Sequence, residues 1–305
     1  MVKTSKMTEM NKIAETVKMP EANRAAEITG VAEAPEMTEA TAMKRLERRL
    51  RELAGKRSAQ RDGQVETGSF DQMMEQFSVY RREILLRNQF INLTAITDPA
   101  EFEEKHFLDS LTLCDDERMA AAGTVLDVGT GAGFPGIPLA IVFPEKKFTL
   151  MDSLGKRVNI VRELAEKIGL KNVEAVHARA EELAKKKEYR EQYDICVSRA
   201  VANMSTLSEY CLPFVKTGGW FVPYKTADAE EEIAAAVNAI HLLGGELQEK
   251  QRIKNEAGGQ HADGDCGHRS TAGTSGHLLV WVRKQRATPA KYPRKAGTPA
   301  KEPLK

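Results

Sequence analysis

The stretch DVGTGAGFPG, from Asp127 to Gly136, contains two overlapping glycine patterns. Counted back from Gly136, it fits G-x-G-x-x-G, with Gly131 and Gly133 in the first two glycine positions. Counted from Asp127, it fits D-x-G-x-G-x-G, which adds Gly129. An apolar run precedes Asp127 and predicts a buried strand, so the glycines form the turn at its carboxyl end. Glycines at such a turn let the backbone approach a ligand closely.

Apolar runs and helical segments alternate along the chain after this strand begins at Thr124. Alternation at this spacing predicts an α/β fold with a doubly wound, mostly parallel sheet and helices N-terminal to it. Ligands bind such sheets at the carboxyl edge, where the glycine turn lies. The runs that predict strands are TVLDVG, KFTLMD, VEAVHAR, YDICVSRA, GGWFVPYK and HLLVWVRK.

The ends of the chain differ from its centre in composition. Met43, Leu46, Leu50 and Leu53 recur at helical spacing in an otherwise charged N-terminal region, which predicts a short basic amphipathic helix. Four segments follow: a charged, disordered extension with that helix over 1–65, N-terminal helices over 66–115, the core over 116–285 with a flexible Gly-rich loop at 254–276, and a basic, proline-containing tail over 286–305.

The charge distribution indicates a polyanionic partner. The net charge of the 305 residues is only +1, but the segments on both sides of the core are basic. Residues 41–61 carry eight Lys and Arg against two Glu, and eight basic residues against one Glu follow from Arg283 to the end. Apolar runs fall short of the roughly 18 residues of a membrane span, and the four cysteines are scattered. We therefore expect a cytoplasmic protein that binds no membrane.

The two glycine patterns predict different ligands. G-x-G-x-x-G is typical of loops that cradle a dinucleotide pyrophosphate. D-x-G-x-G-x-G resembles the S-adenosylmethionine loop of Rossmann-like methyltransferases. A carboxylate at Asp127 suits a cationic aminoacyl group and repels a pyrophosphate, and Pro135 lacks an amide N–H for phosphate. Asp152, at the end of the second strand, suits a ribose in either case. Ala180 and Glu181 follow the third strand, where an adenine would lie. S-adenosylmethionine is therefore the predicted cofactor.

Longer motifs carry a specific resemblance. NLTAI (92–96), KHFLDSL (105–111), DSLGKR (152–157), SRAVA (198–202) and the tail KYPRKAGTP resemble the RsmG (GidB) family, in its Gram-positive form. The similarity runs from about Phe70 to the C-terminus. It implies a Rossmann-like class I S-adenosylmethionine-dependent methyltransferase that methylates guanine N7 at position 527 of 16S rRNA. The N-terminal extension and the Gly-rich loop depart from the family.

The resemblance and the strand ends together nominate site residues. Guanine N7 has a lone pair and no proton to lose, so no acid or base is expected, and positioning should dominate. Arg199 is the predicted positioning residue, for the cofactor carboxylate or for the target nucleotide. The predicted cofactor site comprises Asp127, Gly129, Gly131, Gly133, Phe134, Asp152, Ser153, Leu154, Ala180, Glu181 and Arg199. The predicted RNA contacts are Asn92, Thr94, His106, Lys156, Arg157, Arg179, Lys225, Lys291, Arg294 and Lys295.

Other functions stay open at this point. The second glycine pattern allows an NAD(P)-dependent oxidoreductase, and the basic flanks allow a non-catalytic ribosome-binding factor with a nucleoside pocket. The run HADGDCGH (261–268) offers metal-ligand side chains, but its Gly-rich setting provides little rigidity, so no metal is predicted. The expected partner is 16S rRNA, as such or in the 30S subunit or an assembly intermediate, and the protein is expected to be a monomer.

Overall fold

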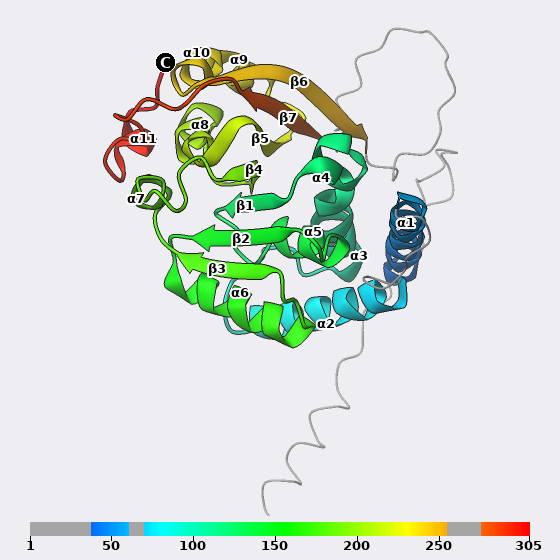
Figure 1. The fold of residues 1–305 in the computed structure, drawn as a ribbon. Coiled ribbons are helices and arrows are strands. Elements are labelled where there is room, and N and C mark those ends of the chain that lie inside the picture. Colours follow the sequence, from blue (N-terminus) through cyan, green and yellow to red (C-terminus); the bar gives the residue numbers. More distant parts are fainter. Residues whose placement is uncertain (1–37, 61–69, 255–275) are drawn as a thin grey trace, which may run out of the picture. The chain divides into compact units, whose positions relative to one another are not determined.

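The computed structural model describes residues 38–60, 70–254 and 276–305. Its centre is a seven-stranded sheet in the order β3-β2-β1-β4-β5-β7-β6 (Figure 1). The first five strands run parallel, whereas β7 pairs antiparallel with both β5 and β6. The predicted α/β, mostly parallel sheet is confirmed. The strands are β1 (Thr124–Val128), β2 (Lys147–Asp152), β3 (Val173–His177), β4 (Tyr193–Arg199), β5 (Val215–Thr226), β6 (Gly245–Lys254) and β7 (Gly276–Lys284).

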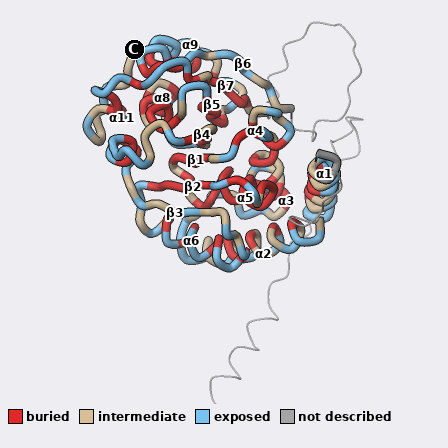
Figure 2. The backbone as a smooth tube through the Cα atoms, in the orientation of Figure 1, coloured by how far each residue is buried: buried red, intermediate tan, exposed pale blue. Residues whose placement is uncertain are grey.

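Helices cover both faces of this sheet. Successive residues of β1 enter different hydrophobic clusters, Val125 with the N-terminal helices and Leu126 with the C-terminal ones, as a doubly wound sheet requires. Buried segments accordingly concentrate in the strands and in α5 (Figure 2). The helices of the first face are α1 (Glu39–Gln60), α2 (Phe70–Asn88), α3 (Pro99–Phe102), the π-helix η1 (Glu103–Leu108), the 3₁₀-helix η2 (Leu111–Asp115), α4 (Glu117–Ala121), α5 (Gly136–Val142) and α6 (Gly155–Ile168). Those of the second face are α7 (Ala180–Leu183), α8 (Met204–Cys211), the 3₁₀-helix η3 (Leu212–Phe214), α9 (Glu230–Ala235), α10 (Val237–Leu242) and α11 (Thr298–Lys301).

Strand β6 was not predicted from the sequence. It lies at the sheet edge and pairs only with β7 among the described strands. Its sequence, GELQEKQRIK, is mostly charged or polar, and just Leu247 and Ile253 pack against the clusters. Charged side chains are common on edge strands because they discourage pairing with other chains. The same charges hide the strand from a search for apolar runs.

The basic helix at the N-terminus is part of the folded core, which corrects the predicted border at residue 65. Helix α1 buries Leu46, Leu50 and Leu53 in the first cluster. Arg45 lies 2.9 Å from the Glu104 carboxylate of η1. Helix α1 and the sheet belong to one compact unit. Of the extension predicted over 1–65, residues 1–37 and 61–65 lie outside the described residues, and of the loop predicted over 254–276, residues 255–275 do.

The predicted basic, proline-containing tail packs on the second cluster. Thr288 and Tyr292 are buried, and the guanidinium of Arg190 donates to both of their carbonyl oxygens, at 2.7 and 3.0 Å. Lys284 is fully buried and donates to Thr288 Oγ1 at 2.8 Å. Burial lowers the pKa of Lys284 to about 8. Counting basic residues therefore overstated how many tail charges are available to a partner.

Within the described ranges, no helix combines the length and the apolar character that a membrane span requires.

Candidate active site

The glycine turn after β1 adopts a conformation that side chains would disturb. Gly129, Gly131 and Gly133 all have positive φ, at 74°, 61° and 106°. A Cβ on Gly129 would lie 2.5 Å from Val201 Cγ2, and one on Gly133 would lie 2.6 Å from Ile137 Cδ1. Both the backbone conformation and the close neighbours therefore require glycine at Gly129 and Gly133.

The amide groups of this turn already have partners. The Gly131 amide donates to Asp152 Oδ2 at 3.1 Å, and the Gly136 amide donates to Asp127 Oδ2 at 3.0 Å. A dinucleotide loop instead directs such amides at a pyrophosphate. The turn thus has the G-x-G-x-x-G spacing without its phosphate-binding arrangement. Four further amides donate to carbonyl oxygens: Gly129 and Thr130 to Met151, and Gly133 and Phe134 to Thr130.

Asp127 holds the turn in place. Its side chain is fully buried, and Oδ2 accepts from Thr130 Oγ1 at 2.7 Å as well as from the Gly136 amide. Burial raises the pKa of Asp127 to about 7. Its other oxygen, Oδ1, is buried without a hydrogen-bond partner among the described residues. Asp127, predicted as part of the cofactor site, thus bonds to the turn itself and lies outside the lining of the adjoining cavity.

A cavity of 250 Å³ opens beside the turn, at the carboxyl edge of β1, β2 and β4. Five residues of the predicted cofactor site line it: Gly129, Asp152, Ser153, Ala180 and Glu181. Arg157 and Arg179, predicted as RNA contacts, also line it, as do Val201 and Tyr210, which were not predicted. Val201 could have been found from its place in SRAVA after β4, whereas nothing in the sequence singles out Tyr210. Six predicted cofactor residues lie outside this lining: Asp127, Gly131, Gly133, Phe134, Leu154 and Arg199.

Asp152 joins the two turns that border the cavity. Its Oδ2 accepts from the Gly131 amide, and its Oδ1 accepts from the Leu154 amide at 2.9 Å. The Arg157 guanidinium lies 3.7 Å from Oδ2. Each carboxylate oxygen has two lone pairs, so Asp152 can accept from a ligand hydroxyl while it keeps these contacts.

Arg199 lies at the end of β4 in a second group of polar residues. Its Nη1 donates to Asp109 Oδ2 at 2.7 Å and to the Lys105 carbonyl at 2.9 Å. The other Asp109 oxygen lies 2.6 Å from Nδ1 of His277, the second residue of β7. Hydrogen bonds from these two partners lower the pKa of Asp109 in spite of its burial, so the carboxylate is ionised. Asp109 belongs to the KHFLDSL motif, whose resemblance places it near the methyl pocket, whereas His277 was not predicted because it is distant from that motif in the sequence.

His106 lies between Arg199 and Thr94. Arg199 Nη2 contacts His106 Nδ1 at 3.2 Å, and His106 Nε2 contacts Thr94 Oγ1 at 2.7 Å. A guanidinium only donates, so Nδ1 accepts and the ring hydrogen is on Nε2. Burial, and then the charge of Arg199, lower the pKa of His106 to about 3. The imidazole is therefore neutral, and it stacks on Phe134 with 4.4 Å between ring centroids.

Phe134 belongs to the aromatic core beneath this group and not to the cavity. Its exposed fraction is 6%, and it packs against Tyr80 and Phe102. The guanidinium of Arg199 lies 5.2 Å from its ring centroid. Phe134 therefore supports Arg199 and His106 from below.

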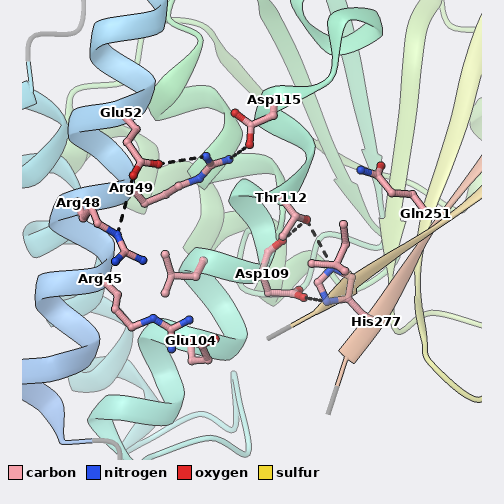
Figure 3. Close-up of a pocket in the computed structure, with 12 residues that line it drawn as sticks. Arg45, Arg48, Arg49, Glu52, Glu104, Asp109, Thr112, Asp115, Gln251 and His277 are labelled. Carbon is pink, nitrogen blue, oxygen red and sulfur yellow. Dashed lines mark hydrogen bonds and ion pairs between the residues drawn. The ribbon is translucent and has the colours of Figure 1, made fainter. Parts of the chain in front are cut away.

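Asp109 lines a second cavity, of 310 Å³ (Figure 3). Its walls come from α1, from η1 and η2, and from β6 and β7. Asp109 contacts His277 across it, and Thr112 also approaches the His277 ring, at 3.4 Å. Arg49 of α1 contacts Asp115 at 2.6 Å. The arginines of α1 face carboxylates here, so this cavity is not a simple anion site.

The predicted RNA contacts differ in their surroundings. Lys225 and Arg294 form ion pairs within the protein: Lys225 contacts Glu232 at 2.6 Å and Arg294 contacts Glu209 at 2.7 Å. Thr94 and His106 bond to each other. The other six are Asn92, Lys156, Lys291 and Lys295, which are exposed, and Arg157 and Arg179 at the first cavity; their contacts with RNA remain predictions.

The metal-ligand residues of 261–268 lie outside the described residues. Over the described part of the chain, groups of three or more His, Cys, Asp or Glu side chains placed to hold a metal ion are absent.

Comparison with known proteins identifies the family. The model of the family described as rRNA small subunit methyltransferase G matches residues 73–261. The ribosomal RNA small subunit methyltransferase G of Alkaliphilus metalliredigens is 44% identical over 247 residues, which cover 80% of this chain and 97% of that protein. The enzyme of the same name from Lachnoclostridium phytofermentans is 45% identical over 231 residues, 76% of this chain and 89% of that protein. A SAM-dependent methyltransferase structure from Aquifex aeolicus aligns with a TM-score of 0.43 and 20% identity, covering 63% and 96% of the two chains. The predicted resemblance is confirmed, and the chain belongs to the rRNA small subunit methyltransferase G family.

Proposed function

We propose that this protein transfers the methyl group of S-adenosylmethionine to N7 of a guanine in 16S rRNA, at position 527. The observation that carries the proposal is the state of the glycine turn. Six of its amides are bonded within the protein, while the adjoining cavity presents the carboxylates of Asp152 and Glu181. This combination suits an uncharged ribose and adenine better than a pyrophosphate. It disfavours the NAD(P)-dependent alternative.

The residues around the cavity fit S-adenosylmethionine. Gly129 leaves room where a Cβ would collide with Val201, so a ligand can lie against the backbone. Asp152 would accept hydrogen bonds from ribose hydroxyls, and Ala180 and Glu181 would border the adenine. Arg157 and Arg179 add positive charge near the donor's carboxylate or an RNA phosphate. When bound, S-adenosylmethionine supplies a methyl group on a positively charged sulfur.

The residues around Arg199 would position the acceptor guanine. N7 reacts through its own lone pair, so the protein must orient the base and exclude water. His106 uses both ring nitrogens in hydrogen bonds and is neutral, which fits a positioning role and not that of a base. Arg199 uses three N–H groups in hydrogen bonds to Lys105, Asp109 and His106. A guanidinium has five N–H groups, so two donors are left for a base or a phosphate.

The substrate is rRNA, either free or within the 30S subunit or an assembly intermediate. We further propose that the protein acts as a monomer. An rRNA substrate supports a place in the cytoplasm.

Primer extension on 16S rRNA tests the proposed function. Treatment with borohydride and aniline cleaves RNA at N7-methylguanosine, so extension stops at a single nucleotide. We expect the stop at position 527 in cells with the gene, its loss on deletion and its return on complementation. A stop that persists after deletion would show that another enzyme makes this modification.

Calorimetric titration separates the remaining alternatives. Binding of S-adenosylmethionine without binding of NAD(H) supports the methyltransferase, and the reverse supports an oxidoreductase. A ribosome-binding factor that only retains a nucleoside pocket would bind the cofactor but leave rRNA unmethylated in vitro.

A further inference from the structure

The C-terminal segment, defined here as residues 288–302, contacts the wall of the first cavity. The amide of Gly297 donates to Oε1 of Glu181 at 2.8 Å. Glu181 lines the cavity, and its exposed fraction is only 4%. Helix α7, which begins at Ala180, has just four residues. So short a helix depends on its neighbours to fix its side chains.

The same segment also forms hydrogen bonds with α8. Glu209 is fully buried, and both of its oxygens accept from the backbone amide or the guanidinium of Arg294, at 2.7–3.1 Å. On the same helix, Thr206 Oγ1 donates to the Pro299 carbonyl at 2.9 Å. Figure 1 shows α11 beside α7 and α8, away from the N-terminal helices.

Tyr210 connects these two contacts. It follows Glu209 in α8 and lines the cavity together with Glu181. Burial first, and then the charges of Glu181 and Glu209, raise the pKa of the Tyr210 phenol. The three side chains are therefore close enough to influence one another, and the C-terminal segment holds two of them.

We propose that the C-terminal segment is a wall of the cofactor site, in which Gly297 and Arg294 act as positioning residues for Glu181 and Tyr210. This inference rests on the proposed function for the identity of the ligand. A site whose side chains are already ordered binds more tightly, because binding does not have to order them. If the segment contacts the cavity wall in only a fraction of the molecules, the apparent affinity for the cofactor falls in proportion to that fraction. The tail thus serves the cofactor, in addition to any role toward RNA.

Gly297→Ala tests the proposal with little disturbance elsewhere. Gly297 has φ of 84°, which L side chains rarely adopt, and a Cβ there meets nothing within 4 Å. The substitution therefore shifts the local backbone, and with it the amide that faces Glu181, without a collision. Gly169→Ala is a matched control: Gly169 ends α6 with φ of 79° and equally open surroundings, and it lies outside the cavity lining.

The readouts are the S-adenosylmethionine Kd by calorimetry and the Tm of each full-length variant without ligand. We expect similar Tm decreases in both variants, with a Kd about tenfold weaker in Gly297→Ala and unchanged in Gly169→Ala. Equal Kd values in Gly297→Ala and wild type would overturn the proposal. So would an equal loss of affinity in Gly169→Ala, because affinity would then follow stability alone.

A second pair of variants addresses the grip on α8. Arg294→Ala leaves the buried Glu209 carboxylate with the backbone amide of residue 294 and without the guanidinium, whereas Arg286→Ala removes a guanidinium whose contacts among the described residues are with His241. We expect the Kd to weaken in Arg294→Ala and to stay within about twofold in Arg286→Ala; equal Kd values in the two variants would contradict the proposal. The wild-type titration tests the proposed function separately from the variants. A wild-type chain that fails to bind S-adenosylmethionine would overturn the proposed function, and this inference with it.

Discussion

The two sides of the candidate active site are made of different parts of the polypeptide. The cavity side depends on backbone: three glycines with positive φ, amides paired with Asp127 and Asp152, and little room for added atoms. The side around Arg199 depends on side chains from η1, β4 and β7 that hold one another by charge. Backbone geometry tolerates few substitutions at the glycines, whereas the side-chain group can lose one member and keep its fold. The comparison predicts that mutations on the two sides fail in different ways.

Gly129→Val should have the largest effect, on cofactor binding. The φ of 74° disfavours a β-branched residue, and the new Cβ would lie 2.5 Å from Val201 Cγ2. We expect the S-adenosylmethionine Kd to rise about 1000-fold, which corresponds to about 4 kcal/mol. Calorimetry of the purified variant, with circular dichroism to establish folding, makes the measurement. A folded variant with wild-type affinity would show that the ligand does not lie against this turn.

Arg199→Ala should lower methyl transfer about 100-fold, because misplacing the acceptor removes most of the benefit of orientation. The fold should remain, since the guanidinium is at a strand end and partly exposed. Because Arg199 is outside the cavity lining, the S-adenosylmethionine Kd should change by less than about threefold. Single-turnover rates and calorimetry give the two quantities. A large loss of cofactor affinity would show that Arg199 belongs to the cofactor site and binds the cofactor carboxylate.

His106 should make the Arg199 side sensitive to acid. Its pKa is about 3 in the folded protein and 6.5 ordinarily, so the unfolded state binds more protons in between. The free energy of unfolding therefore falls as pH falls below 6.5, by up to about 1.4 kcal/mol per unit. His106→Asn does not titrate, and its shorter side chain keeps at most the hydrogen bond made at the Nδ1 position. Between pH 7 and 5, urea denaturation should show a loss of stability about 1–2 kcal/mol smaller than in wild type. An equal loss of stability in the variant and in wild type would show that the imidazole is exposed to water.

Asp127 should give the cavity side the opposite pH dependence of stability. Its pKa is about 7 in the folded protein and 3.8 ordinarily, so the folded state binds more protons between these values. The contribution of Asp127 to stability thus decreases as pH rises from 4 to 7. Asp127→Asn removes this dependence, and the variant should gain about 1–2 kcal/mol relative to wild type between pH 5 and 7. The same denaturation series measures it. A relative loss over that range would mean that the carboxylate is ionised and paired.

The smallest effect is expected outside both sides, at the exposed tail lysines. Lys291→Gln and Lys295→Gln should each lower the slope of log affinity for rRNA against log salt by about 0.7–0.9, if each lysine neutralises one phosphate. Cofactor affinity should not change. Lys171→Gln, at an exposed lysine before β3 on the opposite sheet edge, is the control and should leave the slope intact. Equal slopes in all variants would remove the tail lysines from the RNA contacts.

The cavity side could be predicted because consecutive strands of a parallel sheet end at the same edge. Once β1, β2 and the turn after β3 were recognised, Asp152, Ala180 and Glu181 had to lie near Gly129. The Arg199 side follows no such rule. His277 reaches Asp109 only because β7 runs antiparallel beside β5, and a local pattern does not encode that pairing. Tyr210 was missed for a similar reason, since α8 comes to the cavity through tertiary packing.

The basic flanks show why charge alone misled the prediction of domains. In α1, Leu46 and Leu50 carry the helix into the core while its arginines pair with acids. In the tail, the anchors are Thr288 and Tyr292, too few and too irregular in spacing to form a recognisable stripe. A basic residue that has a buried acid opposite it, as Arg294 has, looks the same in a sequence as one that faces solvent.

The position of the C-terminal segment at the cavity has a consequence for synthesis of the protein. Domains fold from the N-terminus onward while the chain is being made, and residues 288–302 come after every strand of the sheet. The contacts from Gly297 to Glu181 and from Arg294 to Glu209 can form only once those residues have left the ribosome. A nascent chain therefore has its sheet and glycine turn before this wall of the cavity. The wall from the C-terminal segment would thus be the last part of the cavity to form during synthesis.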